Sequence, residues 1–308
     1  MSDSRLVLVD AYSQIFRAFY AIQNLTNSRG EPINALHGFI KIMLKLEREY
    51  PSKFGAVVFD CGKVNFRMTL NPEYKANRKP TPEELKIQVP FIREFLECRG
   101  WPILEECEYE ADDLIAALAQ NSGMEVFFLS TDKDLSQIVN SEITQLVPDA
   151  KSTFTERNPA KVVEKFGVPS ELVTDYLALL GDTADNIPGV PGVGCKTAAK
   201  WLQTYGALLP LLDNPEIVTD VKIRSKLIEN SDLIKKNIAL IKLRSDLPEK
   251  YHNIPVCCLK KTPDRAKLDA FCAKYGLNAI RKELAAENPP APAAEAKVEM
   301  IQDDLFNF

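Results

Sequence analysis

Arg5-Leu-Val-Leu-Val-Asp10 decides the fold class, because it is a short run of apolar residues that ends in an acid. It lacks the alternation of apolar and polar residues of a half-exposed strand, so it predicts a buried, parallel strand. Gly55–Asp60 and Glu125–Ser130 have the same character. Helical patterns separate these runs, at residues 35–50, 83–99 and 110–121. The alternation predicts an α/β fold with a mostly parallel central sheet flanked by helices.

The second half of the chain changes character, because strand patterns stop near residue 155. The segments that look helical there are Ser170–Leu180, Lys196–Tyr205, Val221–Lys236 and Arg265–Tyr275. We therefore expect an α/β core over residues 1–155 and an α-helical subdomain over residues 156–285. The Pro- and Ala-rich residues from 286 to 308 are typical of a flexible linker and tail.

The bulk composition is that of an ordinary globular protein, with 308 residues of which 45% are hydrophobic and 26% charged. The net charge of −5 argues weakly against a nucleic-acid partner. That charge is unevenly placed, since much of it lies in the tail and in the acidic clusters described below. Without these acids the body is basic, so a DNA partner is not excluded.

Cysteine and histidine usage bears on metals and on the compartment. Seven cysteines lack the C-x-x-C spacing of a zinc site, and the chain has only two histidines. The first residues lack the pattern of a signal peptide and no apolar run reaches about 18 residues, so we expect neither a signal peptide nor a membrane span. We therefore expect no zinc site and a reducing, cytoplasmic environment.

Nine acids in five short clusters are the main candidates for a functional site. They are Asp10, Asp60, Glu110, Asp112, Asp113, Asp132, Asp134, Asp182 and Asp185. Each cluster alone has an ordinary explanation. Asp10 after a strand suits a helix N-cap, and acids at 110–113 suit a helix N-terminus. Residues 132–134 suit a solvated turn, and Asp182 and Asp185 suit the start of a loop.

Taken together, the clusters point to metal binding. Strands ending in Asp10, in Asp60 and just before Asp132 would bring these acids to one edge of a parallel sheet. Glu110 and Asp113 share a helix face, as residues three apart do. Packed carboxylates repel one another unless cations neutralise them, and hard oxygen ligands favour Mg²⁺ or Mn²⁺ over zinc.

The order and spacing of these clusters resemble the 5′-nuclease family. This family includes the 5′→3′ exonuclease domain of bacterial DNA polymerase I, phage 5′-nucleases and flap endonucleases. The motifs that carry the resemblance are Glu110-Ala-Asp-Asp, Thr131-Asp-Lys-Asp-Leu and the segment from Gly181 to Ala198. The resemblance extends from about residue 5 to residue 285. One departure is Ala11, where many bacterial members have glycine.

The resemblance implies a PIN-like fold and a structure-specific nuclease with two metal ions, acting in replication primer removal and repair. It places Asp10, Asp60, Glu110 and Asp112, with Asp113 as a further member, around one ion. The acids around the other ion are Asp132, Asp134, Asp182 and Asp185.

The resemblance also gives roles to a basic segment that would otherwise suit a solvated loop. It predicts a helical arch near residues 72–100, through which 5′ single strands pass. Lys75 and Arg78 at its base would contact the scissile phosphate, and Tyr74 would stack on a terminal base. Arg17 matches a phosphate-contacting arginine, although a helix arginine that only reaches toward solvent is the alternative.

Glycines 189, 192 and 194 predict a tight hairpin before a helix that starts near Cys195–Lys196. The free N–H groups of that helix, with Lys196, suit one DNA phosphate without reading sequence. The resemblance identifies a helix-hairpin-helix variant that grips duplex DNA and often holds K⁺.

The tail contains Gln302-Asp-Asp-Leu-Phe306, which resembles the peptide by which bacterial replication proteins dock on the β sliding clamp. Gln302, Leu305 and Phe306 would be the anchors, on a Pro/Ala tether. A disordered terminus is the alternative. The end of the chain at this tail leads us to expect a free-standing, monomeric nuclease.

Two other functions fit part of the sequence. A PIN-type ribonuclease would share the acidic core but not the long helical half. A non-catalytic branched-DNA or clamp-associated protein would not need all nine acids together with Lys75 and Arg78. Metal-dependent cleavage that is specific to a 5′ flap would distinguish a structure-specific nuclease from both of these alternatives.

Overall fold

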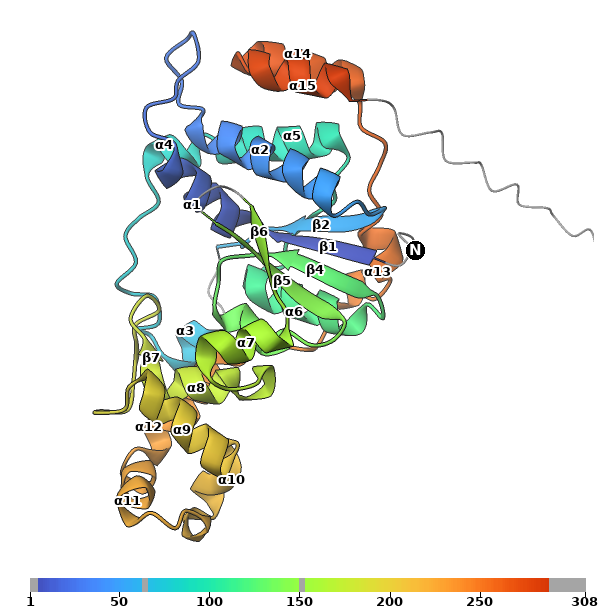
Figure 1. The fold of residues 1–308 in the computed structure, drawn as a ribbon. Helices are drawn as coiled ribbons and strands as arrows, with labels where there is room; N and C mark the ends of the chain where they lie inside the picture. The colour runs from blue at the N-terminus through green and yellow to red at the C-terminus, as the bar shows by residue number, and fades with distance from the viewer. Residues whose placement is uncertain (1–4, 63–65, 150–152, 288–308) are drawn as a thin grey trace, which may run out of the picture.

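The computed structural model describes residues 5–62, 66–149 and 153–287. Its centre is a six-stranded sheet in the order β3-β2-β1-β4-β5-β6, parallel except for β6 at one edge. The strands are β1 (Arg5–Asp10), β2 (Phe54–Val58), β3 (Ile103–Leu104), β4 (Glu125–Leu129), β5 (Ile143–Pro148) and β6 (Phe154–Arg157). Figure 1 shows helices above and below this sheet. The predicted mostly parallel sheet flanked by helices is confirmed.

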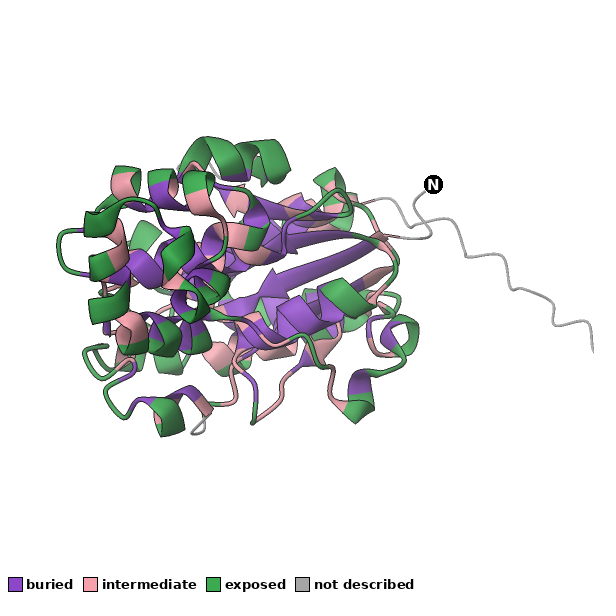
Figure 2. Cartoon of the chain, turned by 90° about the horizontal axis from the view of Figure 1, so that it is seen from below, coloured by how far each residue is buried: buried purple, intermediate pink, exposed green. Residues whose placement is uncertain are grey.

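Each face of the sheet carries its own apolar core, because neighbouring strand residues point to opposite faces. Val7 and Val9 pack in one core, whereas Leu6 and Leu8 pack in the other. The central strands are buried on both sides, as Figure 2 shows. This double burial explains why these strands are continuously apolar.

One face is covered by helices from the first half of the chain and by the last two helices. They are α1 (Ala11–Ala21), α2 (Asn34–Glu49), α4 (Glu83–Lys86), α5 (Val89–Arg99), α14 (Arg265–Tyr275) and α15 (Asn278–Ala286). We expected residues 156–285 to form one helical subdomain. That expectation is wrong for α14 and α15, because Leu268, Phe271 and Ile280 pack in the same core as α2 and α5 (Figure 1).

The other face is covered by helices that continue into a helical lobe. They are α3 (Phe66–Leu70), α6 (Ala111–Asn121), α7 (Pro159–Phe166), α8 (Val173–Leu180), α9 (Cys195–Tyr205), α10 (Leu208–Asp213), α11 (Val221–Glu229), α12 (Ser231–Ile241) and α13 (Ile254–Cys257). The helix expected over Val221–Lys236 is two helices, divided at Asn230.

Two predictions about strands need correction. We expected no strands after about residue 155, yet β7 (Gly181–Asp182) and β8 (Ile187–Pro188) form a short antiparallel pair. β3 and β5 were also not predicted. β3 has two residues, and β5 interleaves polar residues, so neither gives a clear apolar run.

The region expected to form a helical arch has a different structure. Residues 71–82 contain turns and coil but no helix. α5, which was predicted to belong to the arch, packs through Phe95 into the core instead. In Figure 1 the non-helical segment crosses the open side of the molecule between α3 and α4.

Candidate metal and nucleic-acid site

The acids gather at one edge of the sheet, as the sequence predicted. β2, β1 and β4 are parallel neighbours, so their carboxyl ends lie together. Asp10 ends β1, Asp60 follows β2, and Asp132 follows β4. The N-terminus of α6 brings Glu110 and Asp112 to the same edge.

A cavity of about 790 Å³ opens at this edge. Five of the nine predicted acids line it, namely Asp10, Asp60, Glu110, Asp112 and Asp132. Arg17, Lys75 and Arg78, predicted to contact DNA, line the same cavity. Residues far apart in the sequence, from Asp10 to Asp132, therefore converge on one hollow.

Asp10 is the N-cap of a helix and also lines the cavity. As the N-cap of α1 it accepts a hydrogen bond from the backbone N–H of Ser13 at 3.1 Å. Its other oxygen accepts from the Ser130 hydroxyl at 2.8 Å. Burial, with a smaller contribution from the Asp60 charge, raises the pKa of Asp10 from 3.8 to about 7. Asp10 is thus a helix cap and a cavity residue at once.

The first acidic group surrounds the N-terminus of α6. Ligand oxygens of Glu110, Asp112 and Asp113 lie within 4.8 Å of one another. Asp60 is tied to the group because it accepts a hydrogen bond from the Ala111 N–H at 2.8 Å. Burial and then the charges of Asp113 and Glu110 raise the pKa of Asp112 well above its ordinary value. A cation would remove this penalty.

The second acidic group contains Asp134, Asp182 and Asp185, whose ligand oxygens also lie within 4.8 Å of one another. Burial and then the charge of Asp132 raise the pKa of Asp134 well above its ordinary value. Its Oδ1 is buried and has no hydrogen-bond partner. A buried, unpartnered carboxylate oxygen is costly unless a cation binds it. Asp132 lies near this group, since the charges of Asp185 and Asp182 both raise its pKa after burial does.

A basic turn, residues 74–78, joins the two acidic groups. The Lys75 ammonium donates to Glu110 at 2.6 Å, and the Arg78 guanidinium donates to Asp185 at 2.5 Å. The Lys75 N–H also donates to the Asp185 carbonyl at 3.0 Å. Lys75 has a φ of 59°, which is unfavourable for a side chain with a Cβ and occurs mainly where the surroundings enforce it.

Tyr74 does not have the role that we predicted. Its side chain is buried, with 4% exposure, so its ring has no face free for a nucleobase. Its hydroxyl lies 3.1 Å from both Glu110 and Asp185 and so bridges the two acidic groups. The prediction of base stacking is wrong for this conformation, because the ring packs in the core beneath the site.

Asp113 also differs from the prediction. It is fully buried, and its two oxygens accept from the Arg67 guanidinium at 2.5 and 2.8 Å. One of them also accepts from the Arg244 N–H at 3.0 Å. Although Asp113 lies within reach of Glu110 and Asp112, its oxygens already serve this buried ion pair.

α1 contributes functional candidates that were not predicted from the sequence. Tyr12, Phe16 and Tyr20 line the cavity beside Arg17. The rings of Phe16 and Tyr20 are stacked, with centroids 6.4 Å apart, and Tyr20 is 63% exposed. The four-residue spacing of the three aromatic residues was the available signal. Arg17 itself donates to the Asp149 carbonyl.

The glycine-rich hairpin lies before α9 as predicted, and α9 begins at Cys195. Gly189 is required by packing, since a Cβ there would lie 2.1 Å from the Leu180 carbonyl oxygen. Gly192 has a φ of 74°, which favours glycine. Gly194 is different, because a Cβ there would meet nothing within 4 Å. Gly194, Cys195 and Lys196 are all exposed.

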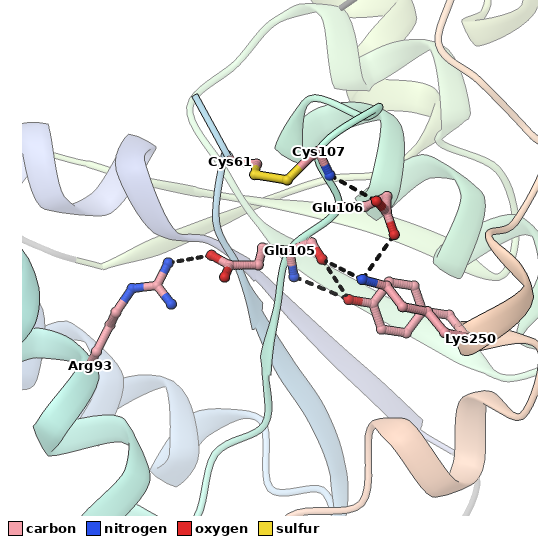
Figure 3. The surroundings of a disulfide bond; sticks show 7 residues. Cys61, Arg93, Glu105, Glu106, Cys107 and Lys250 are labelled. Carbon is pink, nitrogen blue, oxygen red and sulfur yellow. Dashed lines mark hydrogen bonds and ion pairs between the residues drawn. A yellow bond between two sulfur atoms is a disulfide. The ribbon is translucent and has the colours of Figure 1, made fainter. Parts of the chain in front are cut away.

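A disulfide lies beside the acidic cavity, although the sequence predicted a reducing environment, in which disulfides are rare. Cys61, directly after Asp60, is bonded to Cys107, three residues before Glu110 (Figure 3). No local pattern marks the pair, since the two residues lie 46 positions apart.

The donor set fits hard divalent cations. Every predicted ligand offers carboxylate oxygen, and the buried Asp134 Oδ1 has no other partner. Gln302, Leu305 and Phe306, the predicted clamp anchors, lie outside the described residues. Among the residues that are described, no helix is both long and apolar enough to cross a membrane.

Comparison with known proteins places the chain in a family. Residues 5–167 match the 5′-3′ exonuclease N-terminal resolvase-like domain, and residues 168–262 match the 5′-3′ exonuclease C-terminal SAM fold. The thermostable DNA polymerase I of Thermus caldophilus is 37% identical over 295 residues. That alignment covers 95% of this chain and 34% of the relative, so the chain spans about a third of that relative's length.

Solved structures with the same fold include T5 5′-exonuclease with bound divalent zinc ions. Its TM-score is 0.64 at 23% identity, covering 89% of this chain and 98% of that chain. A complex of the bacteriophage T5 flap endonuclease with DNA and metal ions gives a TM-score of 0.63 at 22% identity, covering 91% and 98%. The two domain matches, in this order and over most of the chain, show that the chain belongs to the 5′-3′ exonuclease family.

Proposed function

We propose that this chain hydrolyses phosphodiester bonds at 5′ ends and 5′ flaps of DNA, with Mg²⁺ or Mn²⁺ at the two acidic groups. The observation that carries the proposal is the convergence of Asp10, Asp60, Glu110, Asp112 and Asp132 on one cavity. The second group, with its unpartnered Asp134 oxygen, lies across the basic turn. Family membership and the metal-bound T5 structures support it.

The carboxylates hold and orient the cations in this proposal. Bound divalent cations would supply activation of the attacking water and neutralisation of charge on the phosphodiester. Asp60 and Asp112 belong to one side of the site, and Asp134 and Asp182 to the other. We assign Asp113 to holding Arg67 rather than to a cation, because its oxygens are already paired.

Lys75 and Arg78 would bind the scissile phosphate. Their cationic groups line the cavity between the two acidic groups and now pair with Glu110 and Asp185. Incoming phosphate oxygens would compete for these donors, and cations would satisfy the acids that are released. Donors held in place before the reaction stabilise developing charge without reorganisation.

The DNA path would run from the cavity to the glycine-rich hairpin. Tyr12, Phe16 and Tyr20 offer faces on which bases of a single strand can stack, independent of sequence. The exposed N-terminus of α9 with Lys196 would hold a duplex phosphate. The segment over residues 71–82 would guide the 5′ strand. We also predict that K⁺ binds at the hairpin. Comparing the affinity for duplex DNA in KCl and in NaCl would test this prediction.

The resemblance to the 5′-nuclease family also suggests a biological setting. We propose a cytoplasmic, monomeric enzyme of replication primer removal and repair. A peptide of residues 296–308, titrated into a bacterial sliding clamp by calorimetry, tests the proposed clamp contact.

A labelled 5′-flap duplex and a single-stranded RNA, each incubated with Mg²⁺ and with EDTA, test the proposal. We expect release from the flap with Mg²⁺ alone. Cleavage of the RNA but not of the flap would favour a PIN-type ribonuclease. Binding without cleavage of either substrate would favour a non-catalytic DNA-binding protein.

A further inference from the structure

The Cys61–Cys107 disulfide lies beside the metal ligands and has no role in the proposed reaction. The Cα atoms of the two cysteines are 4.9 Å apart, and both residues are half-buried, so small thiols can reach them. Cys61 continues the chain from Asp60, whereas Cys107 lies in the loop that leads to Glu110 and α6. The bond thus joins the two chain segments that deliver these ligands.

A hydrogen bond also links these segments at the site. The Ala111 N–H donates to Asp60 at 2.8 Å. The negative charges of Asp60 and Glu110 repel each other across the same junction and so oppose this link. The disulfide is a second, covalent link between the same two chain segments.

Other contacts hold the loop on both sides of Cys107. After Cys107, Tyr109 is buried and its hydroxyl donates to Asp246 at 2.6 Å. Glu105 pairs with Arg93 at 2.5 Å, and Glu106 pairs with Lys250 at 2.8 Å (Figure 3). One side chain in each pair, Glu105 and Lys250, is about half exposed, and ion pairs open to solvent contribute little. Tyr251 donates its hydroxyl to the Glu105 carbonyl at 2.8 Å. The contacts of Glu105 and Glu106 hold the start of the loop, directly before Cys107.

We propose that Cys61 and Cys107 form a reversible redox modification site that sets the affinity of the acidic cavity for divalent cations, the disulfide form binding them more tightly. This inference rests on the metal binding proposed above. Oxidation would proceed by exchange with a small disulfide such as oxidised glutathione. The two cysteine thiols lose their hydrogens, one S–S bond forms in the protein, and two glutathione thiols are released.

The physical reason is the repulsion between the acids. In the disulfide form the loop cannot move away from Asp60, so the carboxylates stay close and a cation gains the full benefit of neutralising them. In the dithiol form only the segment around Cys107, between the contacts of Glu106 and Tyr109, would be released from Cys61, and cation binding would have to restrain it again. Disulfides in reducing compartments are usually transient and redox-sensing, which fits this use.

Linkage supplies a test that does not depend on nuclease activity. If the disulfide form binds Mn²⁺ more tightly by some factor, Mn²⁺ must favour the disulfide over the dithiol by the same factor. The full chain is equilibrated in buffers of varied reduced-to-oxidised glutathione ratio, with and without Mn²⁺. Acid quenching, alkylation and peptide mass mapping then give the fraction of Cys61–Cys107 disulfide. Free Mn²⁺ measured by electron paramagnetic resonance gives the affinity of each form.

Variants assign the effect to this pair. Cys61→Ser and Cys107→Ser should each abolish the redox dependence of Mn²⁺ affinity. Cys257→Ser is the matched control, because Cys257 is also half-buried and its Sγ lies 3.9 Å from that of Cys258. It should retain the full dependence. The wild-type titrations need no variant, so misfolding of a serine variant leaves the test intact.

We expect Mn²⁺ affinity roughly fivefold or more tighter in the disulfide form. Saturating Mn²⁺ should shift the squared concentration of reduced glutathione divided by that of oxidised glutathione, at half-oxidation, by the same factor. Equal affinity in both forms, tighter binding by the dithiol, or no disulfide at any glutathione ratio would overturn the inference while leaving the proposed function standing. No Mn²⁺ binding in either form would overturn both.

Discussion

The Arg67 guanidinium holds both carboxylate oxygens of Asp113, at 2.5 and 2.8 Å, with both side chains almost wholly buried. Asp112, the preceding residue, lines the cavity instead. Neighbouring acids in one motif therefore have different surroundings: Asp113 supports the fold, whereas we propose that Asp112 binds a cation. Substitution of each by its amide separates these tasks.

We predict that Asp113→Asn lowers the free energy of unfolding by about 3 kcal/mol, because the buried Arg67 charge loses its bidentate partner and keeps the longer contact with Glu110, at 3.2 Å. Asp112→Asn should not lower the free energy of unfolding in EDTA, because the substitution removes the repulsion from Asp113 and Glu110. Urea unfolding of both variants measures the difference. Equal destabilisation by the two substitutions would contradict the division of tasks.

Asp112→Asn should also remove most cleavage, by roughly a hundredfold or more, because a water-activating cation loses a ligand. Initial rates on a 5′-flap duplex with saturating Mg²⁺ give the measurement. A fully active Asp112→Asn enzyme would show that this acid is not a ligand.

Asp134→Asn should weaken Mn²⁺ binding and remove most cleavage while the fold stays intact. Its Oδ1 is buried without a hydrogen-bond partner, and its charge is opposed by Asp132 and Asp182. The amide relieves this repulsion, so the metal-free variant should melt at or above the wild-type temperature. Calorimetric titration with Mn²⁺ and thermal melting in EDTA check the two expectations, and unchanged Mn²⁺ affinity would exclude Asp134 as a ligand.

Gly194→Val should weaken duplex binding without disturbing the hairpin itself. A Cβ at Gly194 meets nothing within 4 Å, and its φ is −102°, so the backbone tolerates a side chain there. The added side chain would instead occupy the space where a phosphate approaches the α9 N–H groups. Fluorescence anisotropy with a labelled duplex in EDTA should show the loss, and thermal melting should show an unchanged fold.

Gly189→Ala is the control for that prediction. Its Cβ would lie 2.1 Å from the Leu180 oxygen, so it should lower the melting temperature. If Gly194→Val bound duplex with wild-type affinity, the hairpin would not be the duplex contact.

The metal-free protein should become less stable as pH rises from about 4 to about 7. Burial raises the pKa of Asp10 from 3.8 to about 7, and it raises those of Asp112 and Asp134. The folded state therefore keeps protons that the unfolded chain releases in this range, and stability falls as those protons are lost. The melting temperature in EDTA, measured between about pH 4 and about pH 7, tests the direction of this change. Saturating Mn²⁺ should stabilise most at the upper end, and a melting temperature that rises with pH in EDTA would contradict burial of these carboxyls as the cause.

The carboxyl edge was predictable because acids that end buried strands must meet where parallel strands end. Asp10, Asp60 and Asp132 follow that rule, and α9 begins where its glycines predicted. The division between helices at Asn230 and the non-helical segment of the predicted arch were not predicted. Asn230-Ser231-Asp232 was the available signal for the division within residues 221–236, because these residue types favour helix ends. The basic turn gains its conformation from contacts with Asp185.

Pairings between distant residues could not be predicted. Arg67 lies 46 positions from Asp113, and nothing local marks it as that residue's partner. Cys61 and Cys107 are equally far apart. Tyr74 lies in a polar, basic segment and so looked exposed, yet tertiary packing buries its ring. By contrast, the aromatic residues of α1 were missed despite a readable four-residue spacing.

Anomalous diffraction from a Mn²⁺-soaked crystal addresses the central claim most directly, namely that far-separated acids form one dication pocket. We predict Mn²⁺ peaks at the cavity edge, with direct or water-bridged ligation by Asp112 in one group and by Asp134 in the other. Mn²⁺ peaks confined to other surfaces, with the cavity acids ligating none at saturating concentration, would contradict the account.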